Sequence, residues 1–181
     1  MIFRTILWFL RSRRRPTLVI TDVGRMRMRV LPTDIDTLRH VNNGMYLSLM
    51  DLGRVDLMIR AGAWQTFSRL GFYPVVASQT ITYRRSLDLW QAFDLETRII
   101  GLDAKAVYAE QRFVVDGEIY ARGIVKARFL KKSGGTVPVA ELTAALGVDL
   151  SALELPGWIE RWSADVALPA SRAAAPSEWP V

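Results

Sequence analysis

The sequence contains no cysteine and a single histidine, His40. The absence of cysteine excludes disulfides, thiolate zinc sites and a cysteine nucleophile, and it leaves the redox compartment open. One histidine cannot form a histidine metal cluster. The G-x-S-x-G nucleophile motif, the P-loop and the dinucleotide-binding glycine pattern are also missing. These absences exclude several common classes of hydrolase and nucleotide-binding enzyme, and we expect neither a metal nor a cofactor.

The composition is that of one folded domain with a basic character. The chain has 181 residues, half of them hydrophobic, which favours a single domain with tails and a sizeable core. Its formal net charge is +6 and its pI is about 10.1. Part of this excess is local, because five arginines precede the first acidic residue: Arg4, Arg11, Arg13, Arg14 and Arg15. Such a cluster is compatible with nucleic acid, an anionic membrane surface or a phosphate-bearing ligand.

Residues 1–15 combine an apolar run with this arginine cluster. Residues 1–10 are too few to span a bilayer, which takes about 20 apolar residues. The charges follow the run, whereas a secretory signal carries them before it. We interpret residues 1–19 as a basic amphipathic arm with Trp8 and Phe9 on its apolar side, capable of peripheral membrane contact through residues 1–15. The alternative is an arm that packs on its own domain or on a second subunit.

No nucleic-acid recognition motif accompanies the arginines, so we expect no nucleic-acid partner. The first ten residues match neither a spanning segment nor a secretory signal. We therefore expect a cytoplasmic location, or a peripheral one at a membrane surface.

Hydrophobic periodicity predicts a strand, a long helix and then four more strands. Residues 24–31 alternate between arginines and apolar side chains, which is typical of a strand with its methionines and Val30 inward. Residues 44–61 form a helix whose apolar residues occur at nearly every angle, which indicates burial on most sides. Asn42 or Asn43 would cap its start, and Gly62 would end it. Asp51 with Arg54, and Asp56 with Arg60, have the spacing to pair along this helix. The later strands are predicted at residues 73–83, 92–102, 106–115 and 119–130, the last three as an antiparallel meander.

This order predicts an α+β fold in which an antiparallel sheet of about five strands wraps around one long buried helix. Short helices are expected at residues 63–70 and 138–146, and a short packing segment at residues 155–162. The end of the chain is rich in alanine, proline and serine, so we expect a loose tail over residues 166–181.

The polar residues between the first strand and the long helix are the candidates for chemistry. Asp34, Asp36, His40, Asn42 and Asn43 lie within ten positions. Free backbone N–H groups at a helix start can polarise a carbonyl oxygen, and a nearby carboxylate can activate water or attack the carbonyl. That pair suits acyl transfer from a thioester. The alternatives are a cap or brace for the helix, or Mg²⁺ at Asp34-x-Asp36, which would need further oxygen ligands.

The same residues resemble a known family. Hotdog-fold thioesterases of the 4-hydroxybenzoyl-CoA thioesterase-like kind share the pattern Asp34-x-Asp36-x-x-x-His40-Val41-Asn42-Asn43-x-x-Tyr46, followed by Asp51 and Arg54. Within that superfamily the chain is most similar to the thioesterase-superfamily-member-six-like group, and the shared runs include Tyr83-Arg84-Arg85-Ser86-Leu87. The resemblance implies a hotdog domain at residues 20–165 that forms at least a homodimer, with active sites between the subunits.

The resemblance also implies roles for single residues. Asp36 matches the aspartate that acts as nucleophile or base, and the Asn43 and Gly44 amides would hold the oxyanion. The implied substrate is a thioester of coenzyme A or of acyl carrier protein, in lipid metabolism. The other residues expected in the site are His40, which would orient water or the acyl group, and the substrate contacts Tyr46, Arg84 and Arg85. The two arginines would meet coenzyme A phosphates, because the guanidinium fork suits phosphate.

The pattern departs from that of plant acyl-ACP thioesterases at three positions. Their asparagine between the aspartate and the histidine is Leu38 here, and their Glu-Cys pair is Ser86-Leu87. Thioester hydrolysis is the preferred function, and the departures keep a second one open, a non-catalytic acyl-lipid-binding or membrane-surface protein. A dehydratase on the same fold is less favoured, because such sites place a histidine with an acidic partner on the substrate.

Overall fold

A computed structural model describes residues 2–170, 173–177 and 179. Residue 1 of the predicted arm and residues 171, 172, 178, 180 and 181 of the predicted tail lie outside the described residues. The helices are α1 (Ile2–Ser12), α2 (Asn43–Arg60), α3 (Ala63–Leu70), α4 (Val139–Leu146) and α5 (Gly157–Asp165), with a 3-10 helix at Pro32–Asp34. The strands are β1 (Gly24–Arg29), β2 (Phe72–Tyr83), β3 (Ala92–Leu102), β4 (Val107–Val115), β5 (Glu118–Lys131) and β6 (Thr136–Val137).

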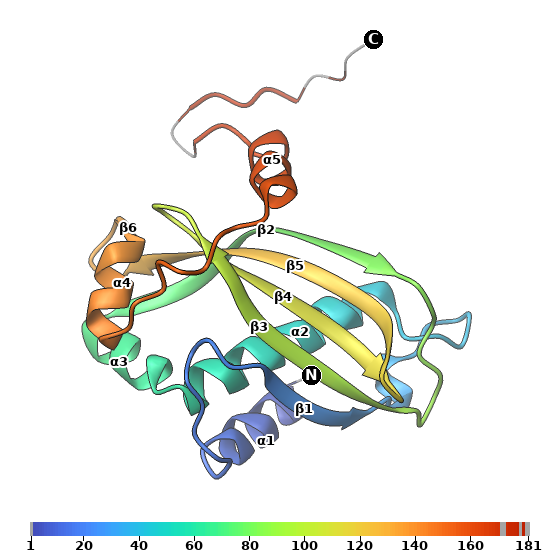
Figure 1. Ribbon diagram of the computed structural model, residues 1–181. Helices are drawn as coiled ribbons and strands as arrows, with labels where there is room; N and C mark the ends of the chain where they lie inside the picture. Colours follow the sequence, from blue (N-terminus) through green and yellow to red (C-terminus); the bar gives the residue numbers. More distant parts are fainter. Residues whose placement is uncertain (1, 171–172, 178, 180–181) are drawn as a thin grey trace.

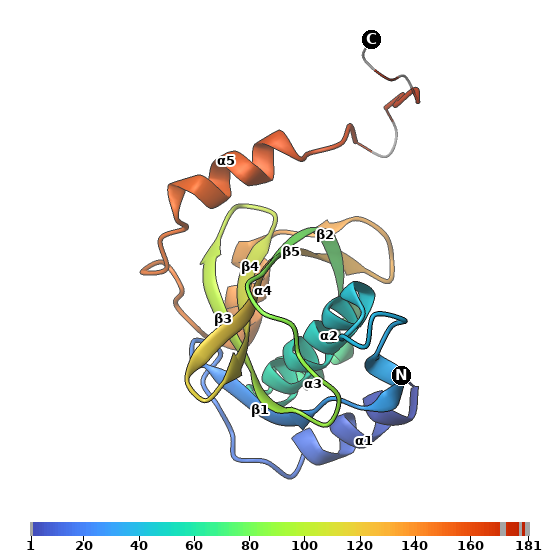
Figure 2. The ribbon, with the colours of Figure 1, turned by 90° about the vertical axis from the view of Figure 1, so that its right-hand side faces the viewer.

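One antiparallel sheet holds the strands in the order β1-β3-β4-β5-β2, and β6 pairs with the last part of β5. The predicted meander of β3, β4 and β5 is confirmed. Its tight turn at Asp116 and Gly117 has φ values of 49° and 82°, as a two-residue hairpin connection requires. The register shifts within β2–β5, β3–β4 and β4–β5. Such bulges bend a sheet, and this one curls around α2 (Figure 2).

Helix α2 runs along the inside of the curled sheet, as the sequence predicts (Figures 1 and 2). Gly53 shows how closely it approaches the strands. A Cβ atom at Gly53 would lie 2.6 Å from Thr97 Oγ1 and 2.8 Å from Gln111 Nε2. The fully buried Gln111 donates hydrogen bonds to the Met50 carbonyl and to Thr97 Oγ1, both at 2.9 Å. The helix is therefore held to the sheet by a satisfied polar contact inside an apolar core.

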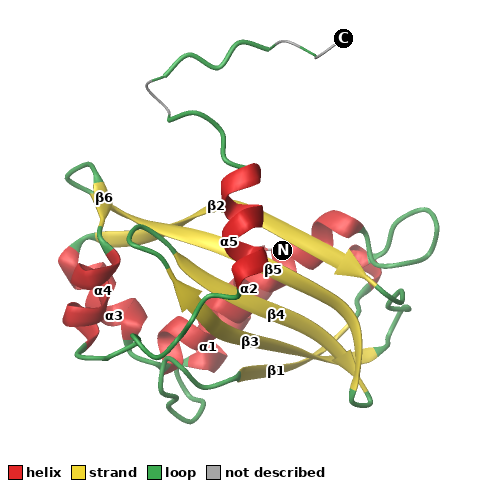
Figure 3. Cartoon of the chain, turned by 45° about the horizontal axis from the view of Figure 1, so that its top comes forward, coloured by secondary structure: helices red, strands yellow, loops and turns green. Residues whose placement is uncertain are grey.

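Helix α5 crosses the outer face of the sheet (Figure 3). Its Ile159 packs against Ala106, Tyr108 and Ile124 of that face. A buried polar chain accompanies this contact, because Lys126 donates to Ser163 Oγ at 2.5 Å, and Ser163 lies 2.8 Å from the Tyr108 hydroxyl. The short packing segment predicted at residues 155–162 is thus largely a helix, and it covers the convex side of the sheet.

Helix α1 packs against α2 next to β1 (Figures 1 and 2). Trp8 contacts the core cluster around α2, and the Phe9 ring meets the Trp64 ring edge-on with centroids 5.6 Å apart. Both rings therefore face the domain, and α1 packs on its own domain, as the alternative interpretation of the arm expected. No helix in the described part of the chain, α1 included, is long and apolar enough to cross a membrane.

Candidate active site

The segment between β1 and α2 folds into a small loop that positions Asp36. Ile35 and Val41 form an isolated antiparallel bridge, and the Asp36 N–H donates to the His40 carbonyl at 2.9 Å. The Asp36 side chain completes the loop, because its Oδ1 accepts the Leu38 N–H at 2.8 Å. Asp36 is half-buried, and its Oδ2 has no hydrogen-bond partner among the described residues. One carboxylate oxygen is thus fixed by the loop while the other remains for a ligand.

The start of α2 supplies one unused backbone donor. Asn42 is the cap residue, and its Oδ1 accepts the Gly44 N–H at 2.8 Å. Asn43 is the first residue of the helix, and within the described chain its N–H has no acceptor. Of the two amides predicted to hold an oxyanion, Asn43 is therefore available, whereas that of Gly44 is already bonded to the cap.

Asp34 lies in the 3-10 turn just before this loop and is almost fully buried. Its Oδ2 accepts hydrogen bonds from the Leu31 N–H at 3.0 Å and from the Arg4 guanidinium at 2.6 Å. These contacts make Asp34 a brace between α1 and the turn, one of the alternatives that the sequence left open. Among the described residues, no group of three or more His, Asp or Glu side chains is arranged to hold a metal ion.

The loop between β2 and β3 runs alongside the Asp36 loop. His40 is exposed and forms a backbone bridge with Asp88, while the Val41 N–H donates to the Leu87 carbonyl at 3.3 Å. Sequence reasoning missed Asp88 as a neighbour of His40, because only the folded chain brings the two loops together. Tyr46 is buried beneath them, and its hydroxyl accepts the Leu87 N–H at 3.3 Å. Burial raises the pKa of the Tyr46 hydroxyl.

Arg84 and Arg85 follow β2 and share one carboxylate. Glu118 lies 2.7 Å from an Arg84 nitrogen and 3.7 Å from an Arg85 nitrogen. The hydrogen bond from Arg84, together with the charges of both arginines, holds the pKa of Glu118 below its ordinary value. Both arginine side chains are more than half exposed. The pair keeps a net positive charge and remains accessible to an anionic ligand.

A cavity of about 220 Å³ lies between the second half of α2 and the sheet. Its lining is apolar except for Asp51, Arg54, Thr97 and Thr143. The apolar residues come from several elements and include Val55, Met58, Phe67, Pro74, Ile99, Phe129 and Leu142. No residue predicted to act in catalysis or substrate binding lines the cavity. Within one chain, the candidate residues and the cavity therefore lie at different ends of α2.

Asp51 and Arg54 border this cavity as an ion pair on α2, and the pairing confirms the sequence prediction for these two residues. Arg54 also donates to Gln111 Oε1 at 2.7 Å, and burial lowers the pKa of its guanidinium. Asp51 stays largely exposed. The helical spacing predicts the pair, but its place at a cavity depends on how the strands curl. Asp51 is thus a second carboxylate that can meet a ligand.

Comparison with known sequences gives a consistent result. A sequence profile described as the thioesterase-like superfamily matches residues 30–163. Protein THEM6 of Xenopus laevis is 42% identical over 99 residues, which cover 55% of this chain and 48% of that protein. Protein THEM6 of Danio rerio is 35% identical over 138 residues, which cover 75% of this chain and 68% of that protein. The matched part thus spans about half the length of the first relative.

Solved structures share the fold at lower sequence identity. The probable thioesterase YbaW of Escherichia coli superposes with a TM-score of 0.64 at 21% identity, covering 68% of this chain and 96% of that one. The protein SAV2348 of Staphylococcus aureus, solved in complex with CoA, superposes with a TM-score of 0.60 at 15% identity, covering 84% of this chain and 99% of that one. The curled sheet around α2 is therefore the hotdog fold that the sequence predicts.

Proposed function

This chain belongs to the thioesterase-like superfamily, and on that premise we propose that it hydrolyses the thioester of an acyl-CoA or acyl-carrier-protein substrate. The observation that carries the proposal is Asp36, which its own loop holds by Oδ1 while Oδ2 is unoccupied by any described residue. Asp36 takes a proton from water as the water oxygen attacks the thioester carbonyl carbon. In the nucleophilic version, the Asp36 carboxylate attacks the carbonyl carbon and the thiolate leaves, and water then hydrolyses the acyl anhydride to release the acid and restore Asp36.

The remaining parts of the step need few protein groups. The negative charge that develops on the carbonyl oxygen is stabilised by the Asn43 N–H at the positive end of α2. The carbon–sulfur bond then breaks, and the thiolate leaves with the carrier. Thiols have a pKa of about 8.5, so the leaving group needs little help from an acid.

The apolar cavity supports an acyl substrate. Each methylene that moves from water into apolar surroundings contributes about 0.8 kcal/mol, so a hydrocarbon tail gains steadily from such a lining. The polar residues Asp51 and Arg54 lie at one side of it and would meet the polar end of the acyl group. We therefore place the acyl tail in the cavity along the second half of α2.

The separation of Asp36 from the cavity supports a site shared by two subunits. Helix α2 has 18 residues and is thus about 27 Å long, with Asp36 before its start and the cavity along its second half. Strand β2 connects the same two ends of the domain. Pro74, near its start, lines the cavity, and Tyr83, its last residue, donates from its hydroxyl to the Asn43 carbonyl at 3.5 Å.

Strand β2 also offers the means of pairing. It is a 12-residue strand at one end of the sheet order, and no other described strand covers its outer edge. Long exposed edges recruit a further strand. Antiparallel pairing of two β2 strands about a two-fold axis would place the end of one beside the start of the other. Asp36 and Asn43 of one subunit would then face the cavity of its partner.

The test is an acyl-CoA hydrolysis assay over a series of chain lengths, with release of free thiol as the readout. The wild-type protein should release thiol, and Asp36→Asn should lower kcat/KM by about 100-fold or more, since a general base contributes at least that factor. Asp165→Asn, at an exposed position at the end of α5, is the control and should keep the activity. Asp51→Asn is a comparison variant, because it removes the carboxylate at the cavity and leaves the Asp36 loop intact. Loss of activity in Asp51→Asn alone would overturn the role of Asp36 but not the thioesterase assignment.

The second candidate function is binding of acyl groups without hydrolysis. Leu87 favours it, because this residue stands where plant acyl-ACP thioesterases have the cysteine of their Glu-Cys pair, and its side chain is fully buried here. Isothermal titration with a non-hydrolysable acyl-CoA analogue distinguishes the two functions. Tight binding by a wild-type protein that releases no thiol from any acyl-CoA would replace the enzyme proposal with this one.

A further inference from the structure

Helix α1 carries an apolar stripe on the side that faces away from the domain. Phe3 is 90% exposed, and Ile6, Leu7 and Leu10 are each more than half exposed. Their spacing of three and four residues places all four on one face of the helix. Contiguous exposed apolar surface of this kind marks an interaction site in a protein that otherwise buries its core.

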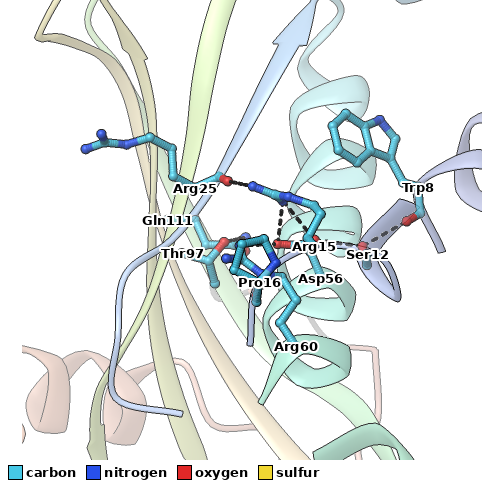
Figure 4. A network of polar contacts seen from close by, with 9 residues as sticks. All are labelled: Trp8, Ser12, Arg15, Pro16, Arg25, Asp56, Arg60, Thr97 and Gln111. Atoms are coloured by element: carbon cyan, nitrogen blue, oxygen red, sulfur yellow. Dashed lines mark hydrogen bonds and ion pairs between the residues drawn. The ribbon is translucent and has the colours of Figure 1, made fainter. Parts of the chain in front are cut away.

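The opposite side of α1 is fastened to the domain at both ends. Arg4 pairs with the buried Asp34 at 2.6 Å near the start of the helix. At its end, Ser12 Oγ donates to Asp56 Oδ1 at 2.7 Å, and Arg15 donates to both Asp56 oxygens at 2.9 Å (Figure 4). Asp56 is itself buried in α2. These contacts fix the orientation of the helix, so the stripe is presented outward on a rigid support.

The charges beside the stripe indicate what it binds. Arg11, Arg13 and Arg14 are exposed at the end of α1, and no acidic residue occurs before Asp22. Arg11 stacks over the Trp8 ring at 5.1 Å and Arg13 over the Phe9 ring at 4.6 Å, which holds both cations next to the helix. A second copy of this surface would bring like charges together, whereas an anionic lipid surface complements both the apolar stripe and the arginines.

We propose that α1 docks the protein on an anionic membrane surface. The helix lies parallel to the bilayer with Phe3, Ile6, Leu7 and Leu10 among the acyl chains. Arg11, Arg13 and Arg14 contact the lipid phosphates. Because Arg4 ties the helix to the turn just before Asp36, docking holds the candidate active site close to the membrane. If the proposed thioesterase function holds, the enzyme takes substrates that partition into lipid.

Flotation with liposomes tests this docking. The 181-residue chain should float with vesicles of 70% phosphatidylcholine and 30% phosphatidylglycerol and bind weakly to pure phosphatidylcholine. The variant Ile6→Gln/Leu10→Gln should lower the partition coefficient by about tenfold or more, since two buried aliphatic side chains are lost from the lipid phase. Arg13→Gln/Arg14→Gln should weaken binding most at low salt. Leu70→Gln, at an exposed apolar position of α3, is the matched control and should float like the wild type.

Two results would overturn the proposal. One is wild-type protein that stays unbound at 30% anionic lipid, and the other is equal flotation of the wild type and the Ile6→Gln/Leu10→Gln variant. Light scattering identifies the rival occupant, a second copy of the chain. If the stripe joins two copies, the Ile6→Gln/Leu10→Gln variant should have a lower molar mass than the wild type, while its flotation should be unchanged. Thermal melting checks that each variant is folded. Docking is measured without substrate, so failure of the hydrolysis proposal leaves this test intact.

Discussion

Arg4 and Asp34 form an ion pair of 2.6 Å that joins the first helix to the turn before the candidate site. The two side chains are 11% and 1% exposed, so the charges meet largely out of water. The Arg4 guanidinium also donates to the Arg29 carbonyl at 3.0 Å. One arginine therefore holds α1, the end of β1 and the 3-10 turn as a single unit.

The first prediction removes one partner of this pair. Arg4→Met should lower the free energy of unfolding by about 3–5 kcal/mol, because it leaves the Asp34 carboxylate buried and unpaired. Arg14→Met, at an exposed arginine of the same segment, should change it by about 0.5 kcal/mol or less. Urea unfolding measures both values. The double variant Arg4→Met/Asp34→Asn should recover part of the lost free energy of unfolding. If it recovers none, the unpaired charge of Asp34 is not the cause of the loss.

The second prediction compares two carboxylates of α2. Asp56 is buried and accepts hydrogen bonds from Ser12, Arg15 and Arg60, so Asp56→Asn should destabilise the protein by about 3 kcal/mol or more. It should also speed tryptic cleavage after the arginines at the end of α1, because the helix loses its support. Asp51→Asn, at the exposed ion pair, should cost about 1 kcal/mol or less. Similar losses of unfolding free energy in the two variants would show that burial does not make Asp56 the more important carboxylate.

Most elements could be predicted because their patterns lie in neighbouring residues. The alternation of arginine and methionine in β1 corresponds to outward and inward side chains in the structure, with Met26 and Met28 buried. The absence of a polar face on α2 predicted its position inside the sheet. Asn42 as cap and the pairs Asp51–Arg54 and Asp56–Arg60 follow from helical spacing alone, and all three are confirmed.

The features that could not be predicted depend on residues far apart in the chain. Nothing near Asp34 indicates that Arg4 will neutralise it, and nothing near His40 indicates Asp88 as its neighbour. The cavity is lined by residues from Ile20 to Leu150, so its position follows only from the curl of the sheet. The two-residue β6 is too short to leave a periodic pattern. The catalytic roles of Asp36 and Asn43 stay predictions.

The third prediction concerns the close approach of α2 to the sheet. Replacing a helical glycine by alanine ordinarily stabilises a helix by up to about 1 kcal/mol. At Gly53 the added methyl would lie 2.6 Å from Thr97 Oγ1 and 3.0 Å from Leu95 Cδ2, so Gly53→Ala should instead destabilise by about 1–3 kcal/mol. Urea unfolding gives the sign directly. The double variant Gly53→Ala/Thr97→Ser keeps the hydroxyl and should not relieve the clash. The double variant Gly53→Ala/Thr97→Ala removes it and should relieve part of the clash.

The fourth prediction concerns the stability of the protein at alkaline pH. Burial, together with the hydrogen bond that the Tyr108 hydroxyl donates to Asp103 at 2.6 Å, raises the pKa of Tyr108 to about 12. An unfolded tyrosine has a pKa of about 10. The folded state therefore holds this proton more tightly than the unfolded state. The resulting stabilisation is complete below about pH 10 and is lost as the pH rises to about 12.

Tyr108→Phe isolates that contribution. The variant should be less stable than the wild type at pH 8, because Asp103 and Ser163 each lose a hydrogen-bond partner. Its free energy of unfolding should nevertheless fall less steeply as the pH rises above about 10, since it lacks the proton that the unfolded wild type releases. The other tyrosines and the lysines titrate in both proteins, so the difference between the two pH profiles belongs to Tyr108. Parallel profiles would show that the hydroxyl ionises equally in both states, and the raised pKa would then be wrong.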